Sequence, residues 1–419
     1  MLSAIGALVG LGLAIVLIFK KVSPVYSLMA GALAGGLIGG SDLVATVSMM
    51  TAGVNDVVPA VVRILAAGVL SGVLIETGAA DTISRTIVDK LGTRHVSLAL
   101  ALATMLLTAT GVFIDVAVIT VAPIGLVLAR RLGLSSSKIL VMMIGGGKCG
   151  NIISPNPNTI IAAENFGADL YSTMVCNVVA AVIGLIFTVY LIGRLVSDTG
   201  SGTVETGVVE DRKDAPGFLA SISGPVVTVI LLALRPLAGI TVDPLVALPV
   251  GGLVGLVVMG RAKRVLGCLS LGLGKMTPVA VLLVATGTIA GVIKSSDLSA
   301  LILSGLGHLH VADVLLAPLA GILMSAATAS TTAGAAVASS SFAPAILDAG
   351  VAPAWGAAMV NAGATVVDHL PHGSFFHATG GAAELSIKQR MKLIPYESAI
   401  GLVLAAVSTL SCIFLSNIL

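Results

Sequence analysis

Charged residues are scarce in this chain: Asp, Glu, Lys and Arg make up 10% of its 419 residues, whereas hydrophobic residues make up 57%. An ordinary soluble domain carries about 25% charged residues, so this composition excludes a soluble enzyme. The mean hydropathy is +1.09, and apolar stretches of about 20 residues recur along the chain. The sequence therefore predicts an all-α, polytopic membrane protein, because helices satisfy their backbone groups internally.

Other patterns are missing as well. The apolar runs at residues 281–293 and 401–411 lack the apolar-polar alternation of membrane β-strands, which excludes a membrane β-barrel. The net charge is +2 and no basic run is interleaved with aromatic residues, which argues against nucleic acid as a partner. The four widely spaced cysteines, Cys149, Cys176, Cys268 and Cys412, are predicted to be buried thiols. We expect neither a metal site nor a cofactor.

The apolar runs predict ten membrane spans, at residues 3–19, 23–40, 57–77, 138–165, 168–193, 218–239, 243–260, 275–295, 353–384 and 393–416. Two further stretches, residues 97–130 and 312–347, are too long for one span of about 20 residues. Polar or small residues interrupt each of them near its centre. Each is therefore predicted to form a re-entrant helical hairpin.

The basic residues predict the orientation. With Lys20 and Lys21 in the cytoplasm, this arrangement leaves all but four of the 22 Lys and Arg residues on the cytoplasmic side. A single crossing at either long stretch would move the basic residues that follow it to the opposite side. We expect both ends of the chain to face outward, in a multi-pass protein of the cell's inner membrane, surrounded by lipid.

The predicted arrangement repeats within the chain. Residues 1–193 hold five spans and one hairpin that start outside, and residues 218–419 hold the same elements starting inside. The halves are expected to be inverted repeats joined by a cytoplasmic linker at residues 194–217, rich in Gly, Thr, Glu and Asp. Inverted repeats are typical of secondary transporters, whereas a scaffold or a membrane enzyme does not need this duplication.

Inverted repeats with hairpins also suggest how such a transporter would move. Residues 97–165 and 312–384 are expected to slide together as a transport unit, in an elevator mechanism. Residues 1–77 and 218–260 are expected to stay as a scaffold, which we expect to form a homodimer.

The span after each hairpin contains residues that break a helix. Residues 145–159 hold three consecutive glycines and two prolines, and residues 361–373 hold the sequence Pro371-His372-Gly373. Pro155 follows Gly133 by 22 residues and His372 follows Gly350 by 22, so the breaks occupy equivalent places. A restarting helix offers free amides to an anion at membrane depth, whereas a lone kink would bind nothing.

Polar residues of the breaks and of the second hairpin turn are the candidate substrate contacts. They are Lys148, Asn151, Ser154, Asn156, Asn158, Thr159, Ser330, Thr331, Thr332, His369 and His372. Hydroxyl groups at the turn can donate to a substrate carboxylate or bond to their own backbone. Lys148 can face the anion or serve as a permanent partner of Asp115 or Asp368, and the sequence does not rank these readings.

Ionisable residues at membrane depth are costly, so a function is their default explanation. The candidates for the coupling proton are Asp115, Asp368 and His369, since imidazole titrates near neutral pH. Asp115 can equally be a structural hydrogen-bond acceptor. Asp115 and His369 are expected to approach the same midplane cavity. Arg63, near the outer end of its span, is expected either to function there or to extend to the membrane interface.

Several short motifs resemble one family. They are Glu76-Thr77-Gly78-Ala79-Ala80-Asp81, Phe113-Ile114-Asp115-Val116, Pro155-Asn156-Pro157, Gly167-Ala168-Asp169 and Gly291-Val292-Ile293-Lys294-Ser295-Ser296. Over nearly the whole chain they resemble the gluconate permease (GntP) family of proton symporters, within the ion-transporter superfamily. The resemblance implies elevator-type, proton-driven transport of gluconate, related sugar acids or small hydroxy acids. The chain has Asn156 where that family usually has His and Asp115 where it usually has Glu, and His369 matches the second break directly.

Proton-coupled uptake of a small organic anion is thus the predicted function, and two alternatives stay open. Breaks rich in Asn, Ser and Thr also suit an oxygen-ligated cation, so sodium-coupled carboxylate transport is the first. A polytopic membrane enzyme is the second, although the loops contain no catalytic constellation.

Overall fold

A computed structural model describes residues 2–20, 22–92, 95–196, 215–298, 313–371 and 373–416. These residues are helical, with no β-strand among them, and a helix covers each of the ten predicted spans. Most of the predicted linker at 194–217 lies outside the described residues. The helices are α1 (Ala4–Phe19), α2 (Pro24–Ile38), α3 (Leu43–Glu76), α4 (Ala79–Leu91), α5 (Val96–Ala109), α6 (Ile114–Leu132), α7 (Ser136–Asn151), α8 (Pro157–Asn165), α9 (Leu170–Cys176), α10 (Val178–Ile186), η2 (Phe187–Ile192), α11 (Gly193–Leu195), α12 (Phe218–Ala238), α13 (Pro244–Val258), η3 (Ala262–Arg264), α14 (Val265–Lys294), η4 (Asp313–Leu315), α16 (Leu316–Thr328), α17 (Thr331–Asp348), α18 (Pro353–Ala364), α19 (Ser374–Ala382), α20 (Ile387–Met391) and α21 (Ile394–Leu415).

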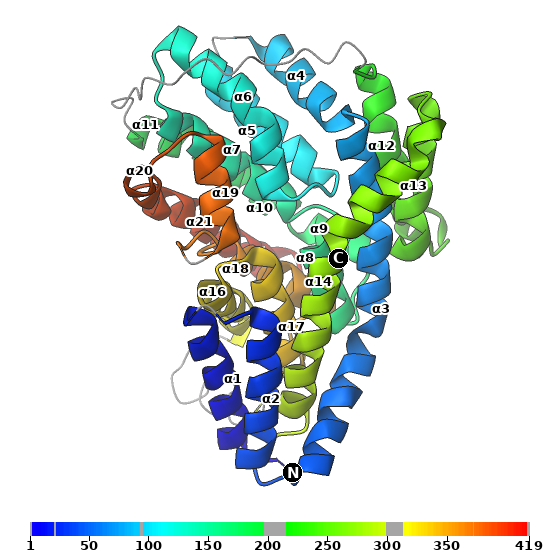
Figure 1. The fold of residues 1–419 in the computed structure, drawn as a ribbon, viewed down its shortest axis with the longest axis vertical. Coiled ribbons are helices and arrows are strands. Elements are labelled where there is room, and N and C mark those ends of the chain that lie inside the picture. The colour runs from blue at the N-terminus through cyan, green and yellow to red at the C-terminus, as the bar shows by residue number, and fades with distance from the viewer. Residues whose placement is uncertain are drawn as a thin grey trace.

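Two long helices, α3 and α14, run side by side (Figure 1). Glycine lets their backbones touch, because a Cβ at Gly53 would lie 2.1 Å from the Gly287 carbonyl oxygen. A Cβ at Gly72 would lie 2.1 Å from the carbonyl oxygen of Cys268. Both helices are longer than predicted, since α3 has 34 residues and α14 has 30. Polar residues such as Asn55 and Asp56 interrupt the apolar pattern, so the sequence did not predict the first part of α3. This part is helical because it packs on α14 and α2.

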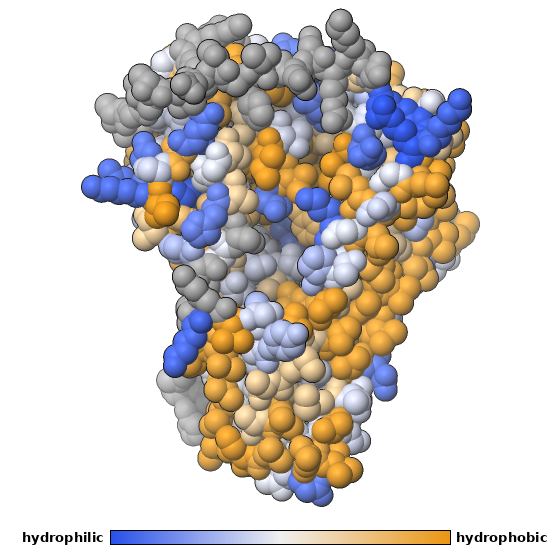
Figure 2. Space-filling model, viewed as in Figure 1, coloured by the Kyte–Doolittle hydropathy of each residue, from blue (hydrophilic) through white to orange (hydrophobic). Residues whose placement is uncertain are grey.

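Two helix pairs flank these long helices at opposite ends (Figure 1). The α1–α2 pair packs on α14, and the α12–α13 pair packs on α3. The lower and right-hand parts of the visible face are predominantly hydrophobic (Figure 2). In the part of the chain that the structure describes, four helical stretches are long and apolar enough to cross a membrane, at residues 43–76, 170–195, 262–294 and 387–415. This surface and these lengths agree with a multi-pass membrane protein.

Both long apolar stretches are interrupted where the sequence predicts. Residues 97–130 form α5 and α6, and residues 312–347 form α16 and α17. The second turn is sharp: Ala329 has a φ of 46°, and the Ser330 hydroxyl accepts a hydrogen bond from the Ala333 amide at 3.2 Å. Such a capping side chain satisfies one of the free amides at a helix start.

The two predicted helix breaks also lie where expected. The first separates α7 from α8, and the second separates α18 from α19. At the first, the Asn156 side chain accepts from the amide of Thr159 at 3.1 Å, and Pro157 begins α8, a position that needs no N–H group. The amphipathic helix α4 lies outside the predicted spans and hairpins, as does the short α20.

Candidate functional site

Both hairpin turns and both helix breaks meet around one cavity of about 130 Å³. Its walls come from the start of α6, the α7–α8 break, the turn into α17 and the α18–α19 break. The lining residues are Phe113, Ile114, Asp115, Asn151, Asn158, Ala329, Ser330, Thr331, Thr332, Asp368 and Phe375. Four segments that are far apart in the sequence therefore form one partly polar cavity.

Helix starts give the cavity a capacity for anions. The first residues of α6 and of α17 line it, and these helices have 19 and 18 residues. The amides of a first helical turn have no partner within the helix, and the helix dipole adds positive potential there. A carboxylate at this place would meet free N–H groups from two helices.

The turn into α17 is bonded to both breaks. The Thr332 hydroxyl donates to Asn158 Oδ1 at 2.5 Å, in the first break. The Thr331 hydroxyl donates to Asp368 Oδ2 at 2.6 Å, in the second break. Thr328, by contrast, bonds to the Met324 carbonyl of its own helix. The hydroxyls of this turn are therefore divided between the cavity wall and the local backbone.

Lys148 is fully buried and bonds to the second break. Its Nζ donates to Asp368 Oδ1 at 2.7 Å and to the carbonyl oxygen of Thr365, and it lies 3.1 Å from His369 Nδ1. The side chains of Lys148 and Asp368 are 0% and 2% exposed. Lys148 thus has three close polar partners, and it is not among the residues that line the cavity. This geometry favours the reading of Lys148 as a permanent partner of Asp368.

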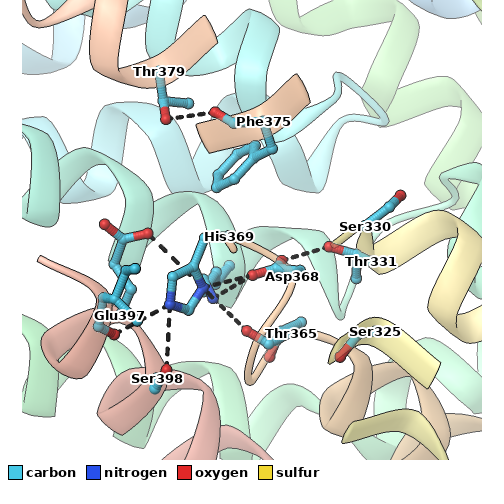
Figure 3. A network of polar contacts seen from close by, with 12 residues as sticks. Ser325, Ser330, Thr331, Thr365, Asp368, His369, Phe375, Thr379, Glu397 and Ser398 are labelled. Atoms are coloured by element: carbon cyan, nitrogen blue, oxygen red, sulfur yellow. Dashed lines mark hydrogen bonds and ion pairs between the residues drawn. The ribbon is translucent and has the colours of Figure 1, made fainter. Parts of the chain in front are cut away.

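Asp368 lies between His369 and Thr331 (Figure 3), and His369 does not line the cavity. Its Nδ1 is 3.0 Å from Asp368 Oδ1, and its Nε2 is 3.1 Å from the Ile394 carbonyl oxygen and 3.2 Å from Ser398 Oγ. The ring is fully buried. Oxygen atoms thus face Nε2, whereas Nδ1 faces both the Asp368 carboxylate and the Lys148 ammonium, so Nδ1 can accept from Lys148 while Nε2 donates.

A second buried ion pair lies beside His369. Arg390 binds Glu397 through its two terminal guanidinium nitrogens, one to each carboxylate oxygen, and both side chains are almost fully buried. The carboxylate also lies 3.9 Å from His369 Nδ1, and the guanidinium stacks 4.9 Å from the Phe376 ring centre. Arg390 lies between the predicted spans 353–384 and 393–416, and neither Arg390 nor Glu397 is among the predicted site residues. An acidic residue inside the predicted span 393–416 was the signal for Glu397.

Asp115 differs from Asp368 in having no such partner. Its Oδ1 accepts only the neighbouring Val116 amide, at 2.9 Å, and no ion pair involves it within the described residues. It is half-buried and lines the cavity. Two carboxylates therefore line the cavity: Asp368, which forms an ion pair with Lys148, and Asp115, which has no ion-pair partner within the described residues.

The remaining predicted residues brace the breaks. Asn156 donates to both Asn151 oxygens, at 2.8 and 2.6 Å, and Thr159 accepts from Asn361 Nδ2 at 3.0 Å, which ties the first break to α18. Ser154 is buried away from the cavity lining, and His372 lies outside the described residues. Of the predicted substrate contacts, Asn151, Asn158, Ser330, Thr331 and Thr332 line the cavity, and Lys148, Ser154, Asn156, Thr159 and His369 do not; of the other candidates for the coupling proton, Asp115 and Asp368 both line it.

Metal ligands are not gathered here. Within the described ranges, no three or more His, Cys, Asp or Glu side chains are close enough together to hold a metal ion. The four cysteines are buried and unpaired by disulfides.

Comparison with known proteins points to one family. The sequence model of the GntP family permeases matches residues 2–417. An uncharacterized transporter of Haemophilus influenzae is 56% identical over 97% of this chain and 97% of its own length. A gluconate permease of Pseudomonas aeruginosa is 27% identical over 90% of this chain and 89% of its own. The D-serine transporter DsdX of Escherichia coli is 21% identical over 77% of this chain and 78% of its own.

A solved structure has a similar fold. The YdaH transporter of Alcanivorax borkumensis matches 89% of this chain and 89% of its own, with a TM-score of 0.63. The sequences are only 17% identical, so this likeness concerns the fold alone.

Proposed function

We propose that this chain, which belongs to the GntP family of permeases, takes up a small organic anion together with protons. The family and the relatives are permeases, so the chain is a transporter and not an enzyme. The proposed substrate is gluconate or a related sugar acid or hydroxycarboxylate, because relatives of this chain are gluconate transporters. The proposed location is the inner membrane.

One observation carries the proposal: the Asp115 carboxylate lines the cavity beside the helix starts that suit an anion. Two negative groups confined in one small cavity repel each other. Binding of a carboxylate substrate is therefore favoured when Asp115 takes up a proton. Proton uptake and substrate binding would then be linked without any separate switch.

The polar lining suits a hydroxylated acid. Asn151 Nδ2 is buried and lacks a hydrogen-bond partner within the described residues, so it is free to donate to a substrate oxygen. The hydroxyls of Ser330 and Thr332 can both donate and accept. Lys148 and Asp368 would remain paired, and His369 would hold the Asp368 carboxylate in place or pass a proton to it.

Uptake into proteoliposomes tests the coupling. Asp115→Asn should abolish accumulation driven by an imposed pH gradient, and it should retain counterflow, which needs no net proton movement. Asp348→Asn, a change at an exposed carboxylate on α17, is the matched control and should behave as wild type. Accumulation by Asp115→Asn with the wild-type pH dependence would remove the coupling role from this residue.

Sodium is the second candidate for the coupling ion, since the amide and hydroxyl oxygens of Asn158, Ser330 and Thr332 line the same cavity. Uptake at fixed sodium, with and without a pH gradient, separates the two. A dependence on the sodium gradient alone would favour the sodium-coupled carboxylate transporter.

We also propose an elevator built from inverted repeats, 1–193 and 218–419, joined by the linker 194–217. Its support is the order of elements: α1 to α3, the α5–α6 hairpin and the broken α7–α8 recur as α12 to α14, α16–α17 and α18–α19. Residues 97–165 and 312–384 would move against the scaffold of residues 1–77 and 218–260, which would form a homodimer. Crosslinks between the two parts should stop transport, and crosslinks within the scaffold should not.

A further inference from the structure

A group of charged residues lies where the proposed transport unit meets the scaffold. Arg63, on α3, binds Asp243 through two bonds, Nε to Oδ1 at 3.1 Å and Nη2 to Oδ2 at 2.8 Å. Its Nη1 also binds the Glu164 carboxylate, at the end of α8. Arg63 therefore does not extend alone to the membrane interface: it joins two scaffold elements and holds one residue of the transport unit.

A second ion pair lies on the same face of α3. Lys294, at the end of α14, binds Asp56 Oδ2 at 2.8 Å. Asp56 and Arg63 are seven residues apart, which places them on one face of the helix and about 10 Å apart along its axis. Because α14 packs along α3, we count Lys294 with the scaffold of residues 1–77 and 218–260. The scaffold thus presents two cation–carboxylate pairs, one above the other, along the helix that α8 contacts.

Glu164, which binds Arg63, lines two cavities, one beside each pair. It lines a cavity of about 200 Å³ together with Arg63 and Asp243, and a second cavity of about 230 Å³ together with Asp56 and Lys294. Cavities of this size with polar walls hold water. A carboxylate moving from one pair to the other would stay hydrated on the way.

We propose that Glu164 exchanges between two stations on the scaffold: the Arg63–Asp243 pair in this structure, and the Lys294–Asp56 pair after the transport unit has moved about 10 Å along α3. This inference rests on the elevator movement proposed above. Each station is a neutral pair by itself, so the departure of Glu164 leaves no unbalanced charge on the scaffold. Glu164 would meet a cation at either end of its movement, which stabilises two resting positions.

The exposure of these groups makes the exchange easy. The side chains of Arg63 and Glu164 are 24% and 26% exposed, and those of Lys294 and Asp56 are 66% and 56% exposed. Partly exposed ion pairs contribute little stability and break readily. The stations would therefore bias the two positions without trapping the transport unit in either.

Distance measurements between spin labels test the stations. One label goes on Ile119 of α6, in the transport unit, and one on Leu245 of α13, in the scaffold. Both positions are exposed, and the native cysteines are buried. Two distance populations are expected in the wild-type background. Lys294→Gln should reduce the second population about two- to fivefold, the range of a partly exposed pair, and Lys294→Arg should restore it.

Within the described residues, no hydrogen bond or ion pair joins Lys294 to Glu164, and Lys294 binds Asp56 instead. A purely structural role of the Arg63–Glu164 bond therefore predicts no change in Lys294→Gln. Lys275→Gln, a change at an exposed lysine of the same helix, is the matched control. Unaltered populations in Lys294→Gln would overturn the two-station proposal. A single distance population in the wild type, with and without gluconate, would instead overturn the elevator.

Discussion

The buried pair of Lys148 and Asp368 allows a sharp test of what holds the second break in place. Lys148→Met keeps an unbranched side chain only one atom shorter and removes its charge. Asp368 would then remain as a carboxylate that is 2% exposed, with the Thr331 hydroxyl and the His369 ring as its remaining partners. Removing one partner of a buried ion pair costs about 3–5 kcal/mol, because the other charge stays buried without compensation. We expect a loss of that size in the free energy of unfolding.

Removing both charges should be less harmful than removing one. Asp368→Asn alone leaves the Lys148 ammonium buried without a counter-charge, with only neutral partners: the new amide oxygen, the Thr365 carbonyl and the His369 ring. The double variant Lys148→Met with Asp368→Asn leaves no buried charge at this place. The sum of the losses in unfolding free energy of the two single variants should therefore exceed the loss of the double variant by about 2 kcal/mol or more.

The chain supplies its own probe for this measurement. Trp355 is the one tryptophan of the sequence, and it is buried on α18, the helix that precedes the break. Its fluorescence during unfolding in mixed micelles reports the free energies, and Lys275→Met serves as an exposed control. Additive losses, or a Lys148→Met protein as stable as wild type, would refute the reasoning. Wild-type stability with weakened substrate binding would instead make Lys148 a substrate contact.

Two further changes test the cavity wall and the scaffold. Thr332→Val removes the donor to Asn158 Oδ1 and should weaken gluconate binding, measured by calorimetry, by about 1–3 kcal/mol; unchanged affinity in a folded variant would exclude Thr332 from the site. Gly53→Ala would place a Cβ 2.1 Å from the Gly287 carbonyl oxygen and should destabilise the protein by about 1–3 kcal/mol or more, whereas Gly274→Ala, which meets nothing within 4 Å, should stabilise it slightly.

Helix positions could be predicted from the sequence because they depend on local patterns. Apolar runs mark the helices, and the prolines and glycines around Asn156 and His369 mark the breaks. The first part of α3 could not be predicted because its polar residues, such as Asp56, break the apolar run that marks a membrane helix. Its helix is stabilised by packing against α14, a contact between segments more than 200 residues apart.

The site was predictable in its residue types and less so in its geometry. The sequence predicts Lys148 in the first break and His369 in the second, and in the structure Lys148 Nζ lies 3.1 Å from His369 Nδ1. It did not foresee that Asp368 alone of these three would reach the cavity. Arg390 and Glu397 flank the junction of α20 and α21, and their pairing depends on how those helices meet. The sequence pattern does not give the angle between α20 and α21.

The burial of the ion pairs assigns different roles to them. Lys148 and Asp368 are almost fully buried, where separating the two charges costs much free energy. This pair therefore suits a part of the molecule that keeps its conformation. Arg63 and Glu164 are partly exposed and flanked by cavities, where separation costs little. In the proposed elevator, movement of the transport unit should therefore begin at the contact of α8 with α3, and the cavity around Asp115 should move without changing its shape.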